Sequence, residues 1–323
     1  MTNPILIAYG LDGKGGGVPL SGKDASDQIK DDKLAWVHLD VNHPDCKSWL
    51  QSEISYLDPF ILDALLAEET RPRISEIGEG MLVILRGVNL NAEESPEDMI
   101  SIRLWIDKHR IISSQRRQLK AVLDIEDRIK TGKGPKDAGD FICMLVSRLF
   151  ERMEPVLTAL DEKTDDAEEQ ILESPDLNLR NGIVSIRRQA IGLRRYMAPQ
   201  KDAIGQLRSS DQAWLSLLNK RQLQESYDRI LRYVEDLDAI RERAQIVKDE
   251  LVNILSDRLN KNMYILSVIA AIFLPLGFLT GLLGINVGGI PGSDYKDAFW
   301  IFCGILVAII SLQVVLFKKL KWF

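Results

Sequence analysis

The 323-residue sequence is poor in the side chains that hold disulfides and tightly bound metals. It contains three cysteines, Cys46, Cys143 and Cys303, and only three histidines. No CxxC pair occurs, which excludes a disulfide framework and a zinc ribbon. Such sparse cysteine usage fits a large, reduced, cytoplasmic portion of the chain.

A surplus of positive charge is also lacking. The chain has 41 lysines and arginines against 47 aspartates and glutamates, a formal net charge of −6. Nucleic-acid-binding proteins usually present a basic face, so this balance argues against nucleic acid as the main partner. Residues 1–17 have no basic segment and no long apolar run, which excludes a signal peptide.

Charge is absent from two long runs near the end of the chain. Residues 263–284 and 298–317 are apolar and uncharged. Each can cross a hydrocarbon core of about 30 Å as a helix. Buried soluble helices are the alternative, but two such runs rarely lack every charge. We therefore predict a hairpin of two transmembrane helices joined by an outer loop, residues 285–297.

Basic residues flank this hairpin on one side. Arg258 and Lys261 precede the first span, and residues 318–323 form a lysine-rich tail. The positive-inside rule places both of these ends in the cytoplasm. We predict a protein of the cell (inner) membrane with two spans and with cytoplasmic N- and C-termini.

Residues 1–135 are predicted to form a cytoplasmic α/β domain. Alternating or β-branched apolar runs indicate strands between glycine-rich and aspartate-rich turns. The GKGGG segment at residues 13–17 lacks the phosphate-loop spacing, so we interpret it as a turn, with a nucleotide site as the alternative. The predicted strands are residues 5–11, 35–41, 81–90, 100–107 and 110–114, and the predicted helices are residues 57–69 and 119–131.

Residues 136–262 are predicted to form a cytoplasmic helical domain with a long stalk helix. Breaks in the helical pattern occur near residues 174–175 and 209–211. From about residue 212 no stop occurs before Gly284, which predicts a helix of about 105 Å. A helix of that length needs partners for its apolar face, so the pattern favours a bundled assembly.

An acidic segment lies within this helical domain. Residues 161–176 contain eight carboxylates and one lysine. We interpret the segment as a solvated helix tip. A surface that collects cations is the alternative.

A line of polar and small residues follows the long helix at heptad spacing. Such a line is a poor hydrophobic seam but suits a water-filled axis, along which Met263 and Leu274 would form constrictions that gate by dewetting. Close helix packing in lipid is the alternative reason for its small residues. The line comprises Glu242, Ile246, Asp249, Asn253, Ser256, Asn260, Met263, Ser267, Ala270, Leu274, Gly277, Gly281 and Gly284.

The first span ends in Gly284, Ile285 and Asn286. Glycine is an ordinary helix cap, whereas asparagine offers an amide oxygen to the water shell of a divalent ion. One span pair cannot enclose a pore, so a transporter requires several copies in cyclic symmetry. A ring of such amides would hold a hydrated ion weakly, as rapid passage requires.

These features resemble the CorA family of divalent-cation transporters over essentially the whole chain. The family signature is Gly-x-Asn at the end of the first span, which Gly284, Ile285 and Asn286 match. Residues 193–200, LRRYMAPQ, resemble the family's arginine–proline segment. The resemblance implies a homopentameric funnel whose central pore is lined by the first span. It also implies that Asn286, at the outer mouth, selects hydrated ions first.

The loop after this signature departs from the magnesium-transporting members. Those continue with Met-Pro-Glu, whereas residues 287–292 here are VGGIPG. This version is similar to the zinc-transport branch, for which proton-coupled uptake has been proposed and efflux has also been considered. Asp249 matches the region where magnesium members place an interfacial acidic metal site.

The residues themselves carry little zinc-specific chemistry. His38, His43 and Cys46 are close in sequence and offer a candidate metal site, although we interpret them as surface and core residues near a strand end. Neither span contains an ionisable residue. An acid that couples protons to transport must therefore lie outside the spans, and Asp249, Asp294 and Asp297 are the candidates.

We therefore predict a divalent-metal transporter that takes up zinc, with proton coupling or passive conduction both open. A magnesium, cobalt or nickel channel of the same family is one alternative, and a membrane-anchored signalling or structural coiled assembly is another. The expected partners are further copies of the chain, divalent ions and the lipid bilayer. We expect no cofactor and no enzyme activity, because no nucleotide-hydrolysis, nucleophile-elbow or HExxH motif is present.

Overall fold

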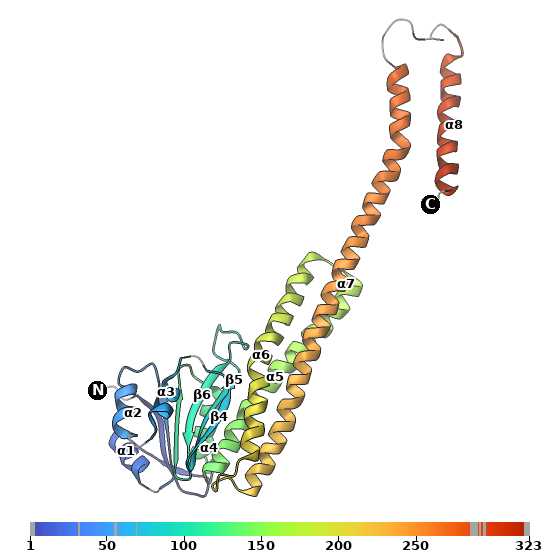
Figure 1. Cartoon of the computed structure of the whole chain (residues 1–323). Helices are drawn as coiled ribbons and strands as arrows, with labels where there is room; N and C mark the ends of the chain where they lie inside the picture. Colours follow the sequence, from blue (N-terminus) through green and yellow to red (C-terminus); the bar gives the residue numbers. More distant parts are fainter. Residues whose placement is uncertain are drawn as a thin grey trace. The chain divides into compact units, whose positions relative to one another are not determined.

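The computed structural model describes residues 4–31, 33–54, 57–68, 70–284, 290, 292 and 295–319. The chain divides into two compact units, Met1–Glu250 and Leu251–Phe323. Helix α7 (Leu217–Leu283) contributes residues to both units (Figure 1).

The first unit is built on a seven-stranded sheet of order β2-β1-β3-β7-β6-β5-β4 (Figure 1). Strands β3 and β7 pair in parallel, and the other neighbours pair antiparallel. Strands β5 and β6 are rich in apolar residues and almost wholly buried, because helices cover the sheet. The strands are β1 (Ile5–Leu11), β2 (Gly17–Pro19), β3 (Ala35–Asp40), β4 (Arg73–Ile77), β5 (Gly80–Gly87), β6 (Ile100–Ile106) and β7 (Arg110–Gln115).

Three short helices cover one face of this sheet. They are α1 (Gly22–Lys30), α2 (Cys46–Glu53) and α3 (Pro59–Leu66). Their buried side chains form one core cluster with alternate residues of the strands, among them Val37 and Leu39. Trp36 lies on the opposite face of β3 from Val37. Its ring packs edge-on against Phe141, which follows the sheet in the chain, with ring centroids 5.2 Å apart. The sheet is therefore buried from both sides.

Longer helices follow the sheet. They are α4 (Lys120–Lys130), α5 (Ala138–Glu173) and α6 (Leu177–Ser209), and α5 and α6 contact strand β5. Asp137 and Asp176 cap α5 and α6 by accepting hydrogen bonds from the backbone N–H groups of Asp140 and Leu179. The predicted α/β portion with long helices after it is confirmed.

The acidic end of α5 is bound by one arginine of α7. The guanidinium of Arg243 pairs with Asp161 and Glu168, each at 2.8 Å, and with Asp165. The hydrogen bonds that Arg243 donates to the carboxylates of Glu168 and Asp165 raise the pKa of this arginine. The three carboxylates are still 40% to 63% exposed, so the tip is solvated as predicted and also ties α5 to α7.

The second unit contains two helices that are long and apolar enough to cross a membrane. They are the end of α7 and α8 (Ala298–Lys319). Their apolar parts coincide with the predicted spans, residues 263–284 and 298–317. The two helices run antiparallel within this unit (Figure 1).

Pro275 interrupts the backbone hydrogen bonding of α7 inside the first span. Proline has no N–H group, so the carbonyl of Ala271, four residues earlier, loses its helical donor. The Nε2 atom of Gln313 on α8 donates to this carbonyl at 3.1 Å. Because an unsatisfied carbonyl is costly in hydrocarbon, the amide of α8 compensates for the proline of α7.

We expect Gln313→Leu to destabilise the hairpin by about 0.5–1.7 kcal/mol, because it leaves the carbonyl of Ala271 without a donor. Pro275→Ala restores an N–H group in α7 and should make the same Gln313 substitution nearly neutral. Thermal unfolding of the purified protein in detergent, for both single variants and the double variant, measures this coupling. An equal loss in both backgrounds would contradict the pairing.

His38 on β3 makes the first unit sensitive to acid. The side chain is fully buried, its Nδ1 lies 2.8 Å from Ser113 Oγ, and its Nε2 has no partner among the described residues. Burial lowers its pKa from 6.5 to about 4. Between these two values the unfolded chain binds a proton that the folded chain does not bind.

We therefore expect the protein to lose stability as the pH falls from 6.5 to about 4, with about 3 kcal/mol from His38. Unfolding curves at several pH values should be less steeply pH-dependent for His38→Gln than for the wild type. An identical pH slope in both proteins would show that His38 is not the group responsible.

Candidate functional site

The predicted heptad line lies on an uncovered face of α7. In the first unit, Glu242, Ile246 and Asp249 are exposed, whereas their helix neighbours Ala244 and Val247 are buried. Because α-helical residues turn by about 100° each, exposed and buried positions separate into two faces. Glu242, Ile246 and Asp249 therefore share the face that the rest of the first unit leaves open.

In the second unit α7 is exposed on nearly all sides, so exposure does not set the line apart there. Met263 and Leu274 are 65% and 70% exposed, whereas Val268 is 8% exposed. Ala271, whose carbonyl binds Gln313, lies nearer the Val268 side of the helix. Within the chain, α8 therefore does not cover the line. The other members Asn253, Ser256, Asn260, Ser267, Gly277, Gly281 and Gly284 are exposed, and Ala270 is half-buried.

Polar groups along the line are held by their own helix. Both carboxylate oxygens of Asp249 accept hydrogen bonds from Gln245 Nε2 at 2.8 Å. The hydroxyl of Ser267 donates to the carbonyl of Met263 at 2.8 Å and keeps its acceptor lone pairs for water. The charge of Asp249 is not neutralised by this amide, so that carboxylate remains attractive to cations.

At the end of helix α7, the backbone N–H of Gly284 donates a hydrogen bond to the carbonyl of Thr280 at 2.9 Å. The predicted selector residues Ile285 and Asn286 lie outside the described residues, as does Asp294. Asp297 precedes α8, and its carbonyl accepts from the N–H of Ile301 at 3.1 Å. Among the site residues predicted at the outer mouth, the structure therefore describes Gly284 alone.

The three residues considered for zinc do not form a metal centre. In the part of the chain that the structure describes, no three His, Cys, Asp or Glu side chains gather closely enough to hold a metal ion. Burial, with a smaller contribution from Asp40, raises the pKa of Cys46 to about 11, which disfavours the thiolate that binds metals. The interpretation of His38, His43 and Cys46 as packing and surface residues fits this arrangement.

The glycine-rich segment at residues 13–17 is a turn, as predicted. Asp12 Oδ1 accepts hydrogen bonds from the backbone N–H groups of Lys14 at 2.7 Å and Gly16 at 2.9 Å. These N–H groups are thus already occupied by a carboxylate and are not available to a phosphate.

The sequence pattern missed the role of Gln313. Its signal was an amide side chain inside a run of apolar residues, since a polar residue at membrane depth usually has a specific partner. The proline that creates the need for this amide is 38 positions away in the chain, so spacing alone does not connect the two.

Comparison with known proteins identifies the family. Residues 31–319 match the family model described as CorA-like Mg2+ transporter protein. The divalent cation transporter CmaX of Pseudomonas aeruginosa is 37% identical over 325 residues, which cover 98% of this chain and 96% of that protein. The zinc transport protein ZntB of Pectobacterium atrosepticum is 36% identical over 315 residues, which cover 98% of this chain and 95% of that protein.

Solved structures agree with this result. The structure of the full-length CmaX protein has a TM-score of 0.85 at 36% identity and covers 98% of both chains. The CorA magnesium transporter from Methanocaldococcus jannaschii has a TM-score of 0.80 over the whole of both chains, and its 18% identity shows a shared fold. The family match and the full-length relatives lead to one conclusion: the chain belongs to the CorA-like Mg2+ transporter family, a family of transporters and not of enzymes.

Proposed function

We propose that the protein transports divalent metal cations through the central pore of a homopentamer in the cell (inner) membrane. The observation that carries the proposal is its full-length similarity to relatives named as a divalent cation transporter and a zinc transport protein. Two candidate spans and the uncovered line on α7 support it. A hairpin of two helices cannot enclose a path for a hydrated ion, so several copies must do so together.

The proposed pore uses the line in three zones. Exposed polar residues of α7, from Glu242 to Ser256, attract cations on the cytoplasmic side. Met263 and Leu274 form hydrophobic constrictions, at which loss of water stops conduction. Asn286 is the proposed selector at the outer mouth, and both termini lie in the cytoplasm.

We propose zinc as the preferred cargo and uptake as its direction. The 36% identity with ZntB and the VGGIPG loop at residues 287–292 support zinc. CmaX, at 37% identity, bears the broader name of a divalent cation transporter, which keeps magnesium, cobalt, nickel and cadmium as alternative cargo. In the described part of the first span no Cys, His or carboxylate occurs, so the ion would pass with its water shell.

Replacing Asn286 by alanine should lower metal flux at least about tenfold, because each subunit loses the amide oxygen that receives the hydrated ion. Flux is measured in proteoliposomes with a zinc-sensitive dye inside. Asn178→Ala, at an exposed position on α6, is the matched control and should conduct as the wild type does. Unchanged flux in Asn286→Ala would remove the selector role. No zinc or magnesium flux in the wild type would favour the membrane-anchored structural or signalling assembly.

Proton coupling is tested in the same proteoliposomes. We expect an inward proton gradient to accelerate zinc entry, and Asp297→Asn to reduce this acceleration more than it reduces entry without a gradient. Entry that ignores the proton gradient would identify passive conduction. Magnesium flux without zinc flux would contradict the interpretation of the loop at residues 287–292.

A further inference from the structure

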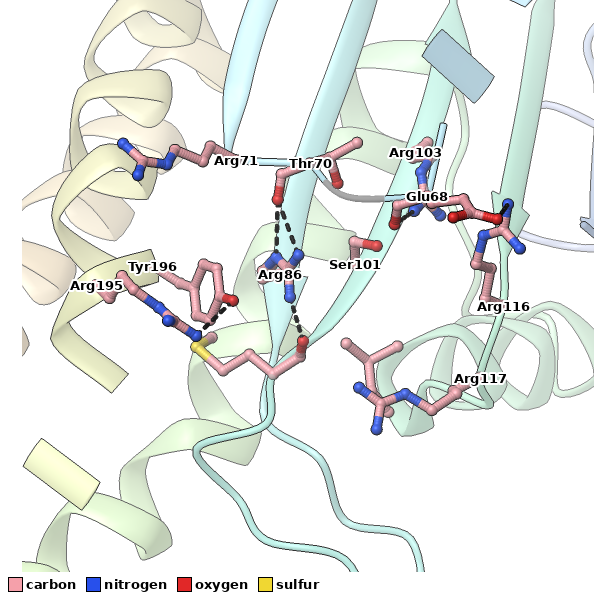
Figure 2. A pocket seen from close by; sticks show the side chains of 12 residues that line it. Glu68, Thr70, Arg71, Arg86, Ser101, Arg103, Arg116, Arg117, Arg195 and Tyr196 are labelled. Atoms are coloured by element: carbon pink, nitrogen blue, oxygen red, sulfur yellow. Dashed lines mark hydrogen bonds and ion pairs between the residues drawn. The ribbon is translucent and has the colours of Figure 1, made fainter. Parts of the chain in front are cut away.

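A strongly basic cavity of about 580 Å³ lies in the first unit (Figure 2), and none of its lining residues belongs to the proposed pore line. It opens at the sheet edge where β5 and β7 end and β6 begins, and Glu68, Thr70 and Arg71 before β4 and Arg195 and Tyr196 of α6 line it as well. Among the described residues that line it, one carries a carboxylate, Glu68. Its six arginines are Arg71, Arg86, Arg103, Arg116, Arg117 and Arg195.

Two of these arginines already have partners within the protein. Arg86 donates to the carbonyls of Thr70 at 2.8 Å and Met99 at 2.5 Å, and lies 4.0 Å above the ring of Tyr196. Arg117 pairs with Glu94 at 2.7 Å outside the cavity. These contacts hold Arg86 and Arg117 in the cavity wall. The other arginines of the wall still outnumber its described carboxylates.

A structural role alone does not explain Arg103. Its side chain is fully buried, and its guanidinium makes one hydrogen bond, from Nη2 to the carbonyl of Glu68 at 3.1 Å. Within the described residues its Nε and Nη1 atoms have no partner, and neither do the buried Arg116 Nε and Thr70 Oγ1 atoms. Buried polar groups are nearly always satisfied, so four such atoms around one cavity indicate a missing acceptor.

The electrostatics agree with this geometry. Burial, and then the like charges of Arg116 and Arg86, lower the pKa of Arg103 to about 10. A guanidinium buried beside other guanidinium groups is destabilised until an anion offsets the repulsion. A divalent metal cation would be repelled from this cavity, so it is not a site for the transported ion.

We propose that this cavity binds a small anion that carries phosphate groups. Phosphate matches the planar forks of arginine in charge and in bidentate geometry, and more than one negative charge suits a wall in which Arg71, Arg103, Arg116 and Arg195 face the single described carboxylate of Glu68. The cavity is within the size range of small-molecule sites, and Met99 and Ile100 supply an apolar wall for an organic group. This binding proposal does not depend on the identity of the proposed cargo.

Binding is tested by calorimetry on the purified full-length protein in detergent, with EDTA present to remove metal ions. The probes are inorganic phosphate, pyrophosphate and ATP. We expect one probe molecule per chain with a dissociation constant below about 1 mM. Tightest binding of ATP would identify an organic phosphate as the source, and tightest binding of phosphate or pyrophosphate would identify an inorganic anion. Either outcome supports the site.

Three variants locate the binding. Arg103→Gln removes the buried guanidinium, and Arg71→Ala removes an exposed arginine of the cavity wall with little risk to folding. Each should weaken binding about tenfold or more. Arg73→Ala, an exposed arginine on β4 outside the cavity, removes the same charge and should bind as the wild type does. No binding of any probe at about 1 mM, or equal binding by Arg71→Ala and Arg73→Ala, would overturn the proposal.

Discussion

The hydrocarbon core of a membrane tolerates very few unsatisfied polar groups, and this constraint explains the second unit of the chain. Its two apolar helices satisfy their own backbones except where Pro275 frees the carbonyl of Ala271. The amide of Gln313 on α8 fills that gap. The spans contain no Asp, Glu, His, Lys or Arg. In the proposed function, a divalent ion crosses with water around it, in a path that one hairpin cannot enclose.

Acidic and basic side chains gather in different places in the first unit. Carboxylates near the end of α5 are tied by Arg243, and exposed acidic residues of α7 follow the uncovered line. Arginines gather instead around the cavity at the sheet edge. The acidic line suits cations and the basic cavity suits anions, so the two features imply separate ligands. A divalent cation and the proposed anion would therefore not compete for one site.

Much of the fold could be predicted because its strongest signals are local. The strands at residues 5–11 and 100–107 and the long helix after residue 212 have clear periodicity, and the structure confirms them within a few residues. Helix α1 was missed because it buries only Ala25, Ser26 and Ile29. Strand β4, RISEI, was missed because a short edge strand with charged side chains lacks an apolar signal.

The candidate site was only partly predictable, for a physical reason. Heptad spacing predicted a line along α7, and in the first unit its members Glu242, Ile246 and Asp249 are exposed. In the second unit α7 is exposed on nearly all sides, so the line there stays a prediction. The arginines of the basic cavity come from five separate segments between Arg71 and Arg195, which meet only after the sheet has formed. In the sequence, Arg103 is a charged residue within an apolar strand, and nothing nearby shows that it is buried without enough acceptors.

Transport through the proposed pore requires that the line of α7 faces water in the assembled protein. Leu274 and its neighbour Phe273 are 70% and 65% exposed within the chain, but only Leu274 belongs to the line. In a background with Cys303→Ser, we predict that a charged thiol reagent reacts with Leu274→Cys in proteoliposomes and blocks metal flux, whereas Phe273→Cys, which faces lipid or protein, does not react. Equal reactivity at both positions, or reaction at Phe273→Cys alone, would contradict the claim.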